Sequence, residues 1–326
     1  MTHRALMLRN TPEFTADVEE IETSGLPEGE VLIRASHSTL NYKDALALCN
    51  RSPVVRIWPM VAGIDAAGTV EASDHPDFRP GDAVTVNGWG MGETRWGGLS
   101  QRVRVPAAWP VRLPSPFGPF EAAALGTAGY TAALCVLALE RHGLTPEDGP
   151  VLVTGATGGV GSVATMLLAR AGYPVVAVTG KRDDADYLRG LGAIEVRDRT
   201  EFTAAGKPLQ KERYAGAVDA LGSHALANVC AQVRRNGAVA ACGLAMGMDF
   251  PASVAPFILR GIALYGIDSV YATQARRQAA WTLLAQRLSP ADLAGIVQKI
   301  GLEEAPTAAA HMLAGQVKGR YVVDLA

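Results

Sequence analysis

The sequence is poor in the residues that hold small secreted domains or metal-bound lobes together. Only four of its 326 residues are cysteine, and they are widely separated: Cys49, Cys135, Cys230 and Cys242. None belongs to a Cys-x-x-Cys pair, so neither a disulfide framework nor a four-cysteine zinc lobe is expected. The six histidines share no His-x-x-x-His spacing. We therefore expect buried, unreactive thiols and no bound metal.

Blocks of like charge and long apolar runs are also missing. The 30 Lys and Arg residues are balanced by 32 Asp and Glu, which argues against a nucleic-acid surface. The N-terminus has no apolar signal-peptide core. Apolar stretches such as Ala132–Leu139 are shorter than the roughly 18–20 residues that span a bilayer. We expect a cytoplasmic globular protein with no nucleic-acid or membrane partner.

The spacing of turn residues changes near residue 120. Before it, short strand-like runs such as Val31–His37, Asp82–Val86 and Ser100–Val105 are bounded by Gly, Pro, Asp or Asn, which is typical of a β barrel. After it, helical and strand-like segments alternate, which indicates βαβ units and a parallel sheet. The chain is therefore predicted to be an α/β protein of two domains.

The second part is predicted in some detail from its periodicity. The expected helices are Pro119–Arg141, Gly158–Ala171 and Asp183–Leu191. The expected strands are Val151–Thr154, Pro174–Thr179, Ala193–Val196, Gly216–Ala220, Ala238–Cys242 and Ile262–Gly266.

A glycine-rich loop, Gly155–Gly161, lies between the strand Val151–Thr154 and the following helix. Glycines there permit a tight turn and a close approach of the backbone to a pyrophosphate, and the helix N-terminus offers N–H groups to its oxygens. The spacing Gly-x-x-Gly-x-x-Gly is weak alone, and a glycine-rich turn without a ligand is the alternative. The strand before it and the amphipathic helix after it favour a dinucleotide site.

The end of the next strand indicates which dinucleotide is bound. NAD enzymes usually carry an acidic residue here for the ribose hydroxyl. This chain has Thr179-Gly180-Lys181-Arg182 instead, a hydroxyl and two cations that suit a 2′-phosphate. A solvated basic pair at a helix start is the alternative. The sequence predicts NADPH.

Motifs along the whole chain carry a family resemblance. The most diagnostic are Leu40–Leu46 (Leu-Asn-Tyr-Lys-Asp-Ala-Leu) and Gly88–Glu93 (Gly-Trp-Gly-Met-Gly-Glu). The others are Val61–Val70, Trp96–Leu99, Gly126–Ala132, Val153–Gly161, Ala241–Leu244, Pro256–Arg260 and Gly266–Val270. With these motifs the chain resembles the medium-chain dehydrogenase/reductase superfamily, and within it the quinone-oxidoreductase-like branch that contains acrylyl-CoA reductases.

The resemblance implies a fold, an activity and an assembly. The fold is a GroES-like β-barrel catalytic domain over residues 1–120, completed by about 260–326, and a doubly wound, parallel-sheet Rossmann domain over 121–259. The activity is NADPH-dependent reduction of the 2,3-double bond of acrylyl-CoA, an acyl-CoA substrate, to propionyl-CoA. A homodimer is the family expectation. Zinc-dependent relatives carry a Cys at the position matching the Asn41–Asp44 stretch, and Gly-His-Glu where this chain has Gly63-Ile64-Asp65, so zinc-independent chemistry is expected.

Cofactor contacts carry over by motif. The resemblance implies that they come from Tyr42, Thr157, Gly158, Gly159, Val160, Thr179, Gly180, Lys181, Arg199, Leu244, Ile258 and Ser269. The stretch Gln316–Arg320 matches more loosely, at the edge of the same pocket.

The catalytic expectation rests on the chemistry of an enoyl thioester. Hydride addition builds enolate charge, which hydrogen-bond donors must stabilise, and a proton must reach Cα. Asn41, Tyr42 and Lys43 are the donors of the motif that replaces the zinc ligand, and Tyr42 is the expected orienting donor or proton source. Asp44 is expected to orient Lys43 or to cap a helix Asp44–Cys49. In the alternative, the whole motif is only a helix cap.

Other interpretations stay open at this point. Trp89, Glu93 and Trp96 either bend over the substrate or pack the barrel loops, and Arg56, Arg260 and Arg320 are candidate cations for CoA phosphates. A quinone or 2-enal reductase would use the same scaffold. A non-catalytic NADPH-binding protein is the candidate from another functional class.

Overall fold

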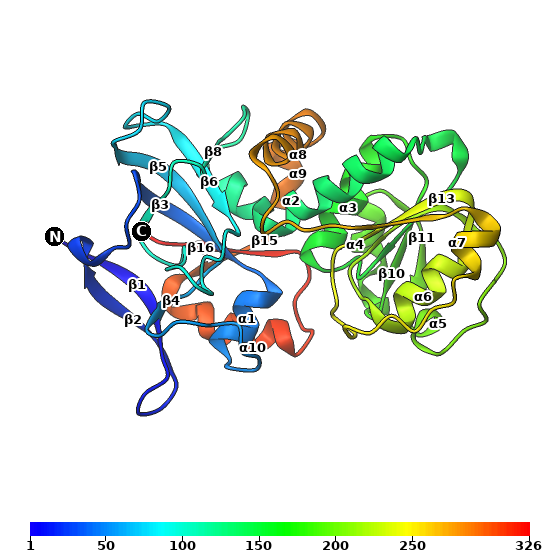
Figure 1. Ribbon diagram of the computed structural model, residues 1–326, viewed down its shortest axis with the longest axis horizontal. Coiled ribbons are helices and arrows are strands. Elements are labelled where there is room, and N and C mark those ends of the chain that lie inside the picture. Colours follow the sequence, from blue (N-terminus) through cyan, green and yellow to red (C-terminus); the bar gives the residue numbers. More distant parts are fainter. The chain divides into compact units, whose positions relative to one another are not determined.

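The computed structural model describes all residues, 1–326, and the chain forms two compact units. Unit 1 comprises Met1–Thr127, Ser269–Ala285 and Ser289–Ala326, and unit 2 comprises Ala128–Asp268 and Gln286–Leu288 (Figure 1). The chain leaves unit 1 after Thr127 and returns at Ser269, whereas the sequence placed these crossings near residues 120 and 260.

Unit 1 is built from two sheets. One has the strand order β2-β1-β4, and the other β15-β16-β3-β5-β6-β8, with β7 also paired to β3. The strands are β1 (Thr2–Arg9), β2 (Thr15–Glu22), β3 (Val31–Leu40), β4 (Met60–Val61), β5 (Asp65–Ser73), β6 (Ala83–Asn87), β7 (Arg102–Val105), β8 (Val111–Arg112), β15 (Val297–Gly301) and β16 (Arg320–Asp324). The helices that begin in unit 1 after β3 are α1 (Tyr42–Leu48), α2 (Pro119–His142), α8 (Gln274–Arg287), α9 (Pro290–Ala294) and α10 (Ala305–Leu313). Apolar side chains from β1, β3, β5, β6 and α10 form one continuous core.

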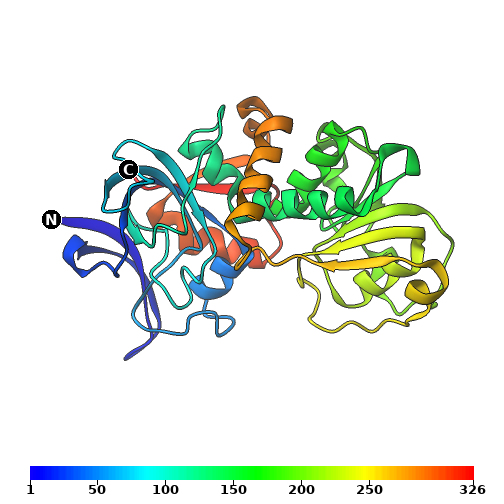
Figure 2. The same ribbon diagram turned by 45° about the horizontal axis from the view of Figure 1, so that its top comes forward.

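Unit 2 contains one six-stranded sheet of order β11-β10-β9-β12-β13-β14, in which every neighbouring pair is parallel. Its strands are β9 (Val151–Thr154), β10 (Val175–Thr179), β11 (Ala193–Asp198), β12 (Tyr214–Asp219), β13 (Val233–Ala241) and β14 (Ala263–Gly266). Its helices are α3 (Gly159–Arg170), α4 (Ala185–Gly190), α5 (Thr200–Thr203), α6 (Ser223–Gln232) and α7 (Ala255–Arg260). Helices α3 and α6 pack on opposite faces (Figure 2). Each strand expected from the sequence overlaps an observed one. The signal is clearest for β9, β10 and β12, whose residues are all buried.

Helix α2 (Pro119–His142) covers the segment expected to be helical, Pro119–Arg141, but it is not continuous. Its backbone breaks at Gly126, which has φ +51° and ψ −159°. An L residue rarely adopts that positive φ, so the break requires glycine. By length and composition α2 is the one helix able to cross a membrane, yet 83 % of its most apolar window is buried within the protein, as in a core helix.

Candidate active site

The glycine loop of unit 2 has the geometry of an anion cradle. Gly155 takes a positive φ of +61°, and Gly158 is the N-cap of α3. A Cβ at Gly161 would lie 2.3 Å from the Gly155 carbonyl oxygen, so only glycine permits this approach of helix to loop. The first-turn N–H groups of α3, at Gly159 and Val160, have no helical partner. The residues present therefore fit a bound pyrophosphate.

Four further residues predicted to bind the cofactor meet at the end of β10. The Thr179 hydroxyl lies 3.2 Å from the Thr157 hydroxyl and accepts a 3.0 Å hydrogen bond from the Lys181 N–H. The Arg199 N–H donates to the Thr179 carbonyl at 2.9 Å. A Cβ at Gly180 would lie 2.9 Å from the Arg199 guanidinium carbon. A cation thus lies directly against Gly180, as a 2′-phosphate would require.

Arg182, the second cation of the sequence motif, has a different role. Its guanidinium is paired with Asp198. Hydrogen bonds from Thr200 and the Arg182 pair lower the pKa of Asp198 to about 2. Arg182 is therefore paired with a carboxylate, and the cation that lies beside Gly180 is Arg199.

The remaining cofactor residues are spread over both units. Leu244 and Ile258 are exposed on unit 2, at 55 % and 73 %. Tyr42 and Ser269 belong to unit 1. Their shared contact with one cofactor stays a prediction.

The Asn41–Asp44 motif in unit 1 forms the start of α1. Asn41 is the N-cap, and the Asp44 carboxylate accepts a 2.8 Å hydrogen bond from the Asn41 N–H, which closes a capping box. The helix begins at Tyr42, two residues before the expected start at Asp44, because the cap is Asn41. The Tyr42 side chain is exposed, at 47 %. The Lys43 ammonium donates to Glu93 at 2.8 Å, whereas the Asp44 carboxylate accepts from the N–H groups of Asn41 and Ile64. Lys43 is therefore oriented by Glu93 and not by Asp44.

Trp89 and Trp96, from the glycine-rich stretch Gly88–Leu99, pack against other residues of unit 1. Trp89 stacks on Trp109 with 5.8 Å between ring centroids and 3° between ring planes. The buried Arg277 guanidinium lies 4.2 Å from the Trp89 ring centroid. Trp96 packs against the unit 1 core. The packing interpretation of this loop is therefore the one the contacts support.

Two of the three arginines considered for CoA phosphates are held inside the fold. The Arg260 guanidinium donates to the carbonyls of Ala231 and Gln210, and Arg320 is only 3 % exposed. The expectation is wrong for both, because each guanidinium is bonded within its own unit: Arg260 to these carbonyls and to Glu212, and Arg320 to the Ala124 carbonyl and to side chains. Arg56 is exposed.

A group of polar side chains, most of them buried, surrounds Asn41 at the start of α1. We call Asn41, Asp44, Asp65, Thr127 and Arg320 the buried polar cluster. Asp65 Oδ2 accepts hydrogen bonds from Asn41 Nδ2 at 2.7 Å and the Thr127 N–H at 2.9 Å. Asp65 Oδ1 accepts from the Thr127 hydroxyl at 2.6 Å and from Asn87 at 2.7 Å. Sequence reasoning missed Asp65, although a carboxylate inside the apolar run Val61–Val70 was a signal for it.

The charge of Arg320 completes this cluster. Its Nη1 donates to Asn41 Oδ1 at 3.2 Å, and its Nη2 donates to the Thr39 hydroxyl at 2.8 Å. Burial lowers the pKa of Arg320, and the charges of Asp65 and Asp44 oppose that shift. No group of three or more His, Cys, Asp or Glu side chains is arranged to hold a metal ion.

The carboxyl group of Asp44 titrates near neutrality. Burial, followed by the negative charge of Asp65, raises its pKa from 3.8 to about 7, although it accepts hydrogen bonds from Asn41 and the Ile64 N–H. Between pH 3.8 and about pH 7, the Asp44 carboxyl is protonated more often in the folded chain than in the unfolded chain. The contribution of Asp44 to stability is therefore greatest at acid pH and is lost as the pH rises through about 7.

Replacing Asp44 by asparagine is expected to remove this pH dependence. The free energy of unfolding of the unaltered protein should exceed that of Asp44→Asn most at about pH 4.5, and the difference should shrink steadily until about pH 7 to 8. Denaturant unfolding at intervals across this range measures both curves. Two curves that run parallel from pH 4.5 to pH 8 would contradict the raised pKa of Asp44.

Comparisons with known proteins match both units. Residues 27–115 match the model of the alcohol dehydrogenase GroES-like domain, and residues 159–286 match that of the zinc-binding dehydrogenase domain. The chain is 49 % identical to the acrylyl-CoA reductase AcuI of Ruegeria pomeroyi, over 95 % of this chain and 94 % of that protein. It is 45 % identical to the putative quinone oxidoreductase YhfP of Bacillus subtilis, over 97 % of each.

Solved structures agree with this similarity. The yhdH oxidoreductase of Salmonella enterica, crystallised with NADP, superposes with a TM-score of 0.97 at 46 % identity, over 99 % of this chain and all of that one. The Bacillus subtilis yhfP structure, which has NAD bound, gives a TM-score of 0.95 at 44 % identity and full coverage of both chains. The expected combination of a GroES-like domain with a parallel-sheet Rossmann domain is confirmed.

Proposed function

Because this chain belongs to the medium-chain dehydrogenase/reductase superfamily, in its quinone-oxidoreductase-like branch, we propose that it is an NADPH-dependent reductase of acrylyl-CoA. The product is propionyl-CoA. The observation that carries the proposal is the 49 % identity to a named acrylyl-CoA reductase over almost the full length of both chains.

The residues that would hold NADPH lie mainly in unit 2. The first-turn N–H groups of Gly159 and Val160 would bind the pyrophosphate, next to Gly158, whose own N–H is donated to the Gly155 carbonyl at 2.9 Å. Lys181 and Arg199 would pair with the 2′-phosphate. When bound, the cofactor supplies the hydride that adds to the β-carbon of the thioester. Leu244, Ile258 and Ser269 line its nicotinamide side in this proposal, together with Tyr42. Thr157 joins the pyrophosphate cradle, and Thr179 and Gly180 meet the 2′-phosphate beside Lys181.

The polar side chains at the start of α1 have different roles in the proposed reaction. Tyr42 is exposed, so its hydroxyl is the donor that stabilises the enolate oxygen or delivers the proton to Cα. Both N–H groups of the Asn41 carboxamide are already bonded to Asp44 and Asp65, so Asn41 acts by holding the start of the helix. Lys43 contributes positive charge beside Glu93.

Three further attributes belong to this proposal. The reaction is zinc-independent, because the stretch Asn41–Asp44 holds no Cys and Gly63-Ile64-Asp65 holds no His where the resemblance places the zinc ligands. The protein is cytoplasmic and acts as a homodimer. Neither a nucleic acid nor a membrane takes part.

A second candidate has a specific observation in its favour. The similarity to a putative quinone oxidoreductase, and to its structure with NAD bound, supports a quinone or 2-enal reductase without CoA specificity. The same cofactor residues would serve that reaction.

Steady-state kinetics with purified full-length protein separates these candidates. We expect acrylyl-CoA to be reduced with a kcat/KM at least about 100-fold above that of a free enone or a quinone, and NADPH to be preferred over NADH by a similar factor. Comparable turnover of all three substrates would contradict the CoA assignment. A preference for NADH would contradict the roles of Lys181 and Arg199. Tight NADPH binding without turnover of any acceptor would favour a non-catalytic binding protein.

A further inference from the structure

The buried polar cluster has no spare hydrogen-bonding capacity at its centre. Asp65 accepts four hydrogen bonds, two on each carboxylate oxygen, from Asn41, Asn87 and Thr127. A carboxylate offers about four lone-pair directions, so this group is saturated. Asn41 is likewise committed, with both amide hydrogens donated to Asp44 and Asp65 and its oxygen accepting from Arg320.

The backbone around the cluster is fitted to it. A Cβ at Gly126 would lie 2.7 Å from Arg320 Nη2, 2.7 Å from Thr39 Cγ2 and 3.0 Å from Asp65 Oδ2. The break in α2 at Gly126 is what brings the Thr127 N–H and hydroxyl onto Asp65. The last residue of unit 1 before the chain enters unit 2 is therefore bonded to the same carboxylate as Asn41.

A cluster of this kind is a costly way to stabilise a core. Burying charged groups carries a desolvation penalty that well-packed apolar residues of similar size avoid. What the cluster does secure is orientation, because each of its hydrogen bonds restricts the Asn41 side chain or its surroundings. Asn41 is the N-cap of α1, and the next residue, Tyr42, is the exposed one.

We infer that Asp65 and Arg320 are positioning residues of the reductase site, which fix Asn41 and through it the Tyr42 hydroxyl. The inference deepens the proposed function and rests on it. Asp65 and Arg320 act through Tyr42 and do not touch the substrate. Their replacement should therefore cost activity only while the Tyr42 hydroxyl is present.

A double-mutant cycle of Asp65→Asn and Tyr42→Phe in the full-length protein tests this dependence. Misplacing a catalytic group by about 1 Å costs up to about 100-fold, so Asp65→Asn should lower kcat for acrylyl-CoA by about 10- to 100-fold. In the Tyr42→Phe background the same change should cost less than about 3-fold. The Kd for NADPH, measured by fluorescence, should stay within about 3-fold, because its phosphate sites lie in unit 2.

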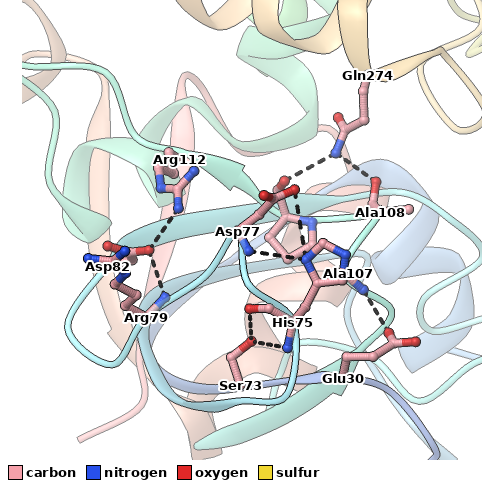
Figure 3. A network of polar contacts seen from close by, with 11 residues as sticks. Glu30, Ser73, His75, Asp77, Arg79, Asp82, Ala107, Ala108, Arg112 and Gln274 are labelled. Carbon is pink, nitrogen blue, oxygen red and sulfur yellow. Dashed lines mark hydrogen bonds and ion pairs between the residues drawn. The ribbon is translucent and has the colours of Figure 1, made fainter.

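The matched control is Asp82→Asn. Asp82 is also a hydrogen-bonded carboxylate of unit 1, held by Arg112 at 3.1 Å and by the Arg79 N–H at 3.0 Å (Figure 3). It belongs to a separate network and should leave kcat unchanged. If Asp65→Asn does not fold, Thr127→Val removes one 2.6 Å hydrogen bond to Asp65, and the same cycle is run with that smaller change.

The outcomes separate the inference from the proposed function. Equal losses in the Tyr42 and Tyr42→Phe backgrounds would overturn the positioning role while leaving the reductase activity in place. If the unaltered protein reduces no acceptor, the proposed function fails. The inference is then judged by the rate of Tyr42 nitration by tetranitromethane, followed by peptide mapping. A change of at least about 3-fold in Asp65→Asn but not in Asp82→Asn would support it, and an unchanged rate would overturn it.

Discussion

Replacing Gly161 by alanine is expected to lower the affinity for NADPH by at least about 10- to 100-fold and the free energy of unfolding by about 1–3 kcal/mol. The new Cβ would lie 2.3 Å from the Gly155 carbonyl oxygen and 2.5 Å from Ala156 Cα. Both are backbone atoms, so no rotamer change relieves the overlap. The loop must move away from α3, and its N–H groups then leave the pyrophosphate.

Two measurements follow this change: titration of NADPH by fluorescence, and denaturant unfolding followed by circular dichroism. Gly190→Ala is the matched control in the same unit. Its Cβ meets no atom within 4 Å, and Gly190 ends the helix α4 without a positive φ. Alanine there should leave NADPH affinity unchanged. Normal NADPH binding by Gly161→Ala would show that the glycine loop is not the cofactor site.

Replacing Tyr42 by phenylalanine is expected to lower kcat for acrylyl-CoA by about 100-fold or more, as the loss of a general acid or an oxyanion donor usually does. The ring remains, so the first turn of α1 and the affinity for NADPH should change little. The effect should fall on kcat more than on KM, because the hydroxyl acts where charge develops.

Tyr265→Phe provides the comparison for this hydroxyl. Tyr265 lies on β14 in unit 2, and its hydroxyl is 2.9 Å from His142 Nδ1. Its loss removes a defined hydrogen bond far along the sequence from the motif and should leave kcat unchanged. If Tyr42→Phe and Tyr265→Phe are equally active, the Asn-Tyr-Lys-Asp motif is only a helix cap, the alternative that the sequence left open.

The parts of this protein that sequence reasoning predicted are those fixed by neighbours in the chain. The strand Val151–Thr154 and the loop Gly155–Gly161 are contiguous, and their spacing alone specifies strand, turn and helix start. Thr179, Gly180 and Lys181 follow one another in the same way. The pairing of Arg182 with Asp198 was missed because Asp198 belongs to the following strand, β11. Hydrophobic periodicity does not show which residues of different segments lie opposite each other.

The parts that sequence reasoning missed depend on residues far apart in the chain. Arg320 was considered as a cation for phosphates, yet it bonds Asn41 across 279 positions. The break at Gly126 is visible only once Arg320, Thr39 and Asp65 are known to surround it. A single sequence does not state such contacts, because hydrophobic periodicity reports which face is buried and not which polar groups meet there.

The saturation of Asp65 also bears on how this enzyme can evolve. A single substitution within the buried polar cluster leaves at least one buried donor or acceptor without its partner, and that loss costs about 1–3 kcal/mol. A substitution in the cluster must therefore be accompanied by a second one that restores the lost hydrogen bond. Substitutions of exposed residues near Tyr42, in contrast, leave no buried group without a partner. New acceptor specificities should therefore arise by mutation of those exposed residues, with the cluster inherited intact.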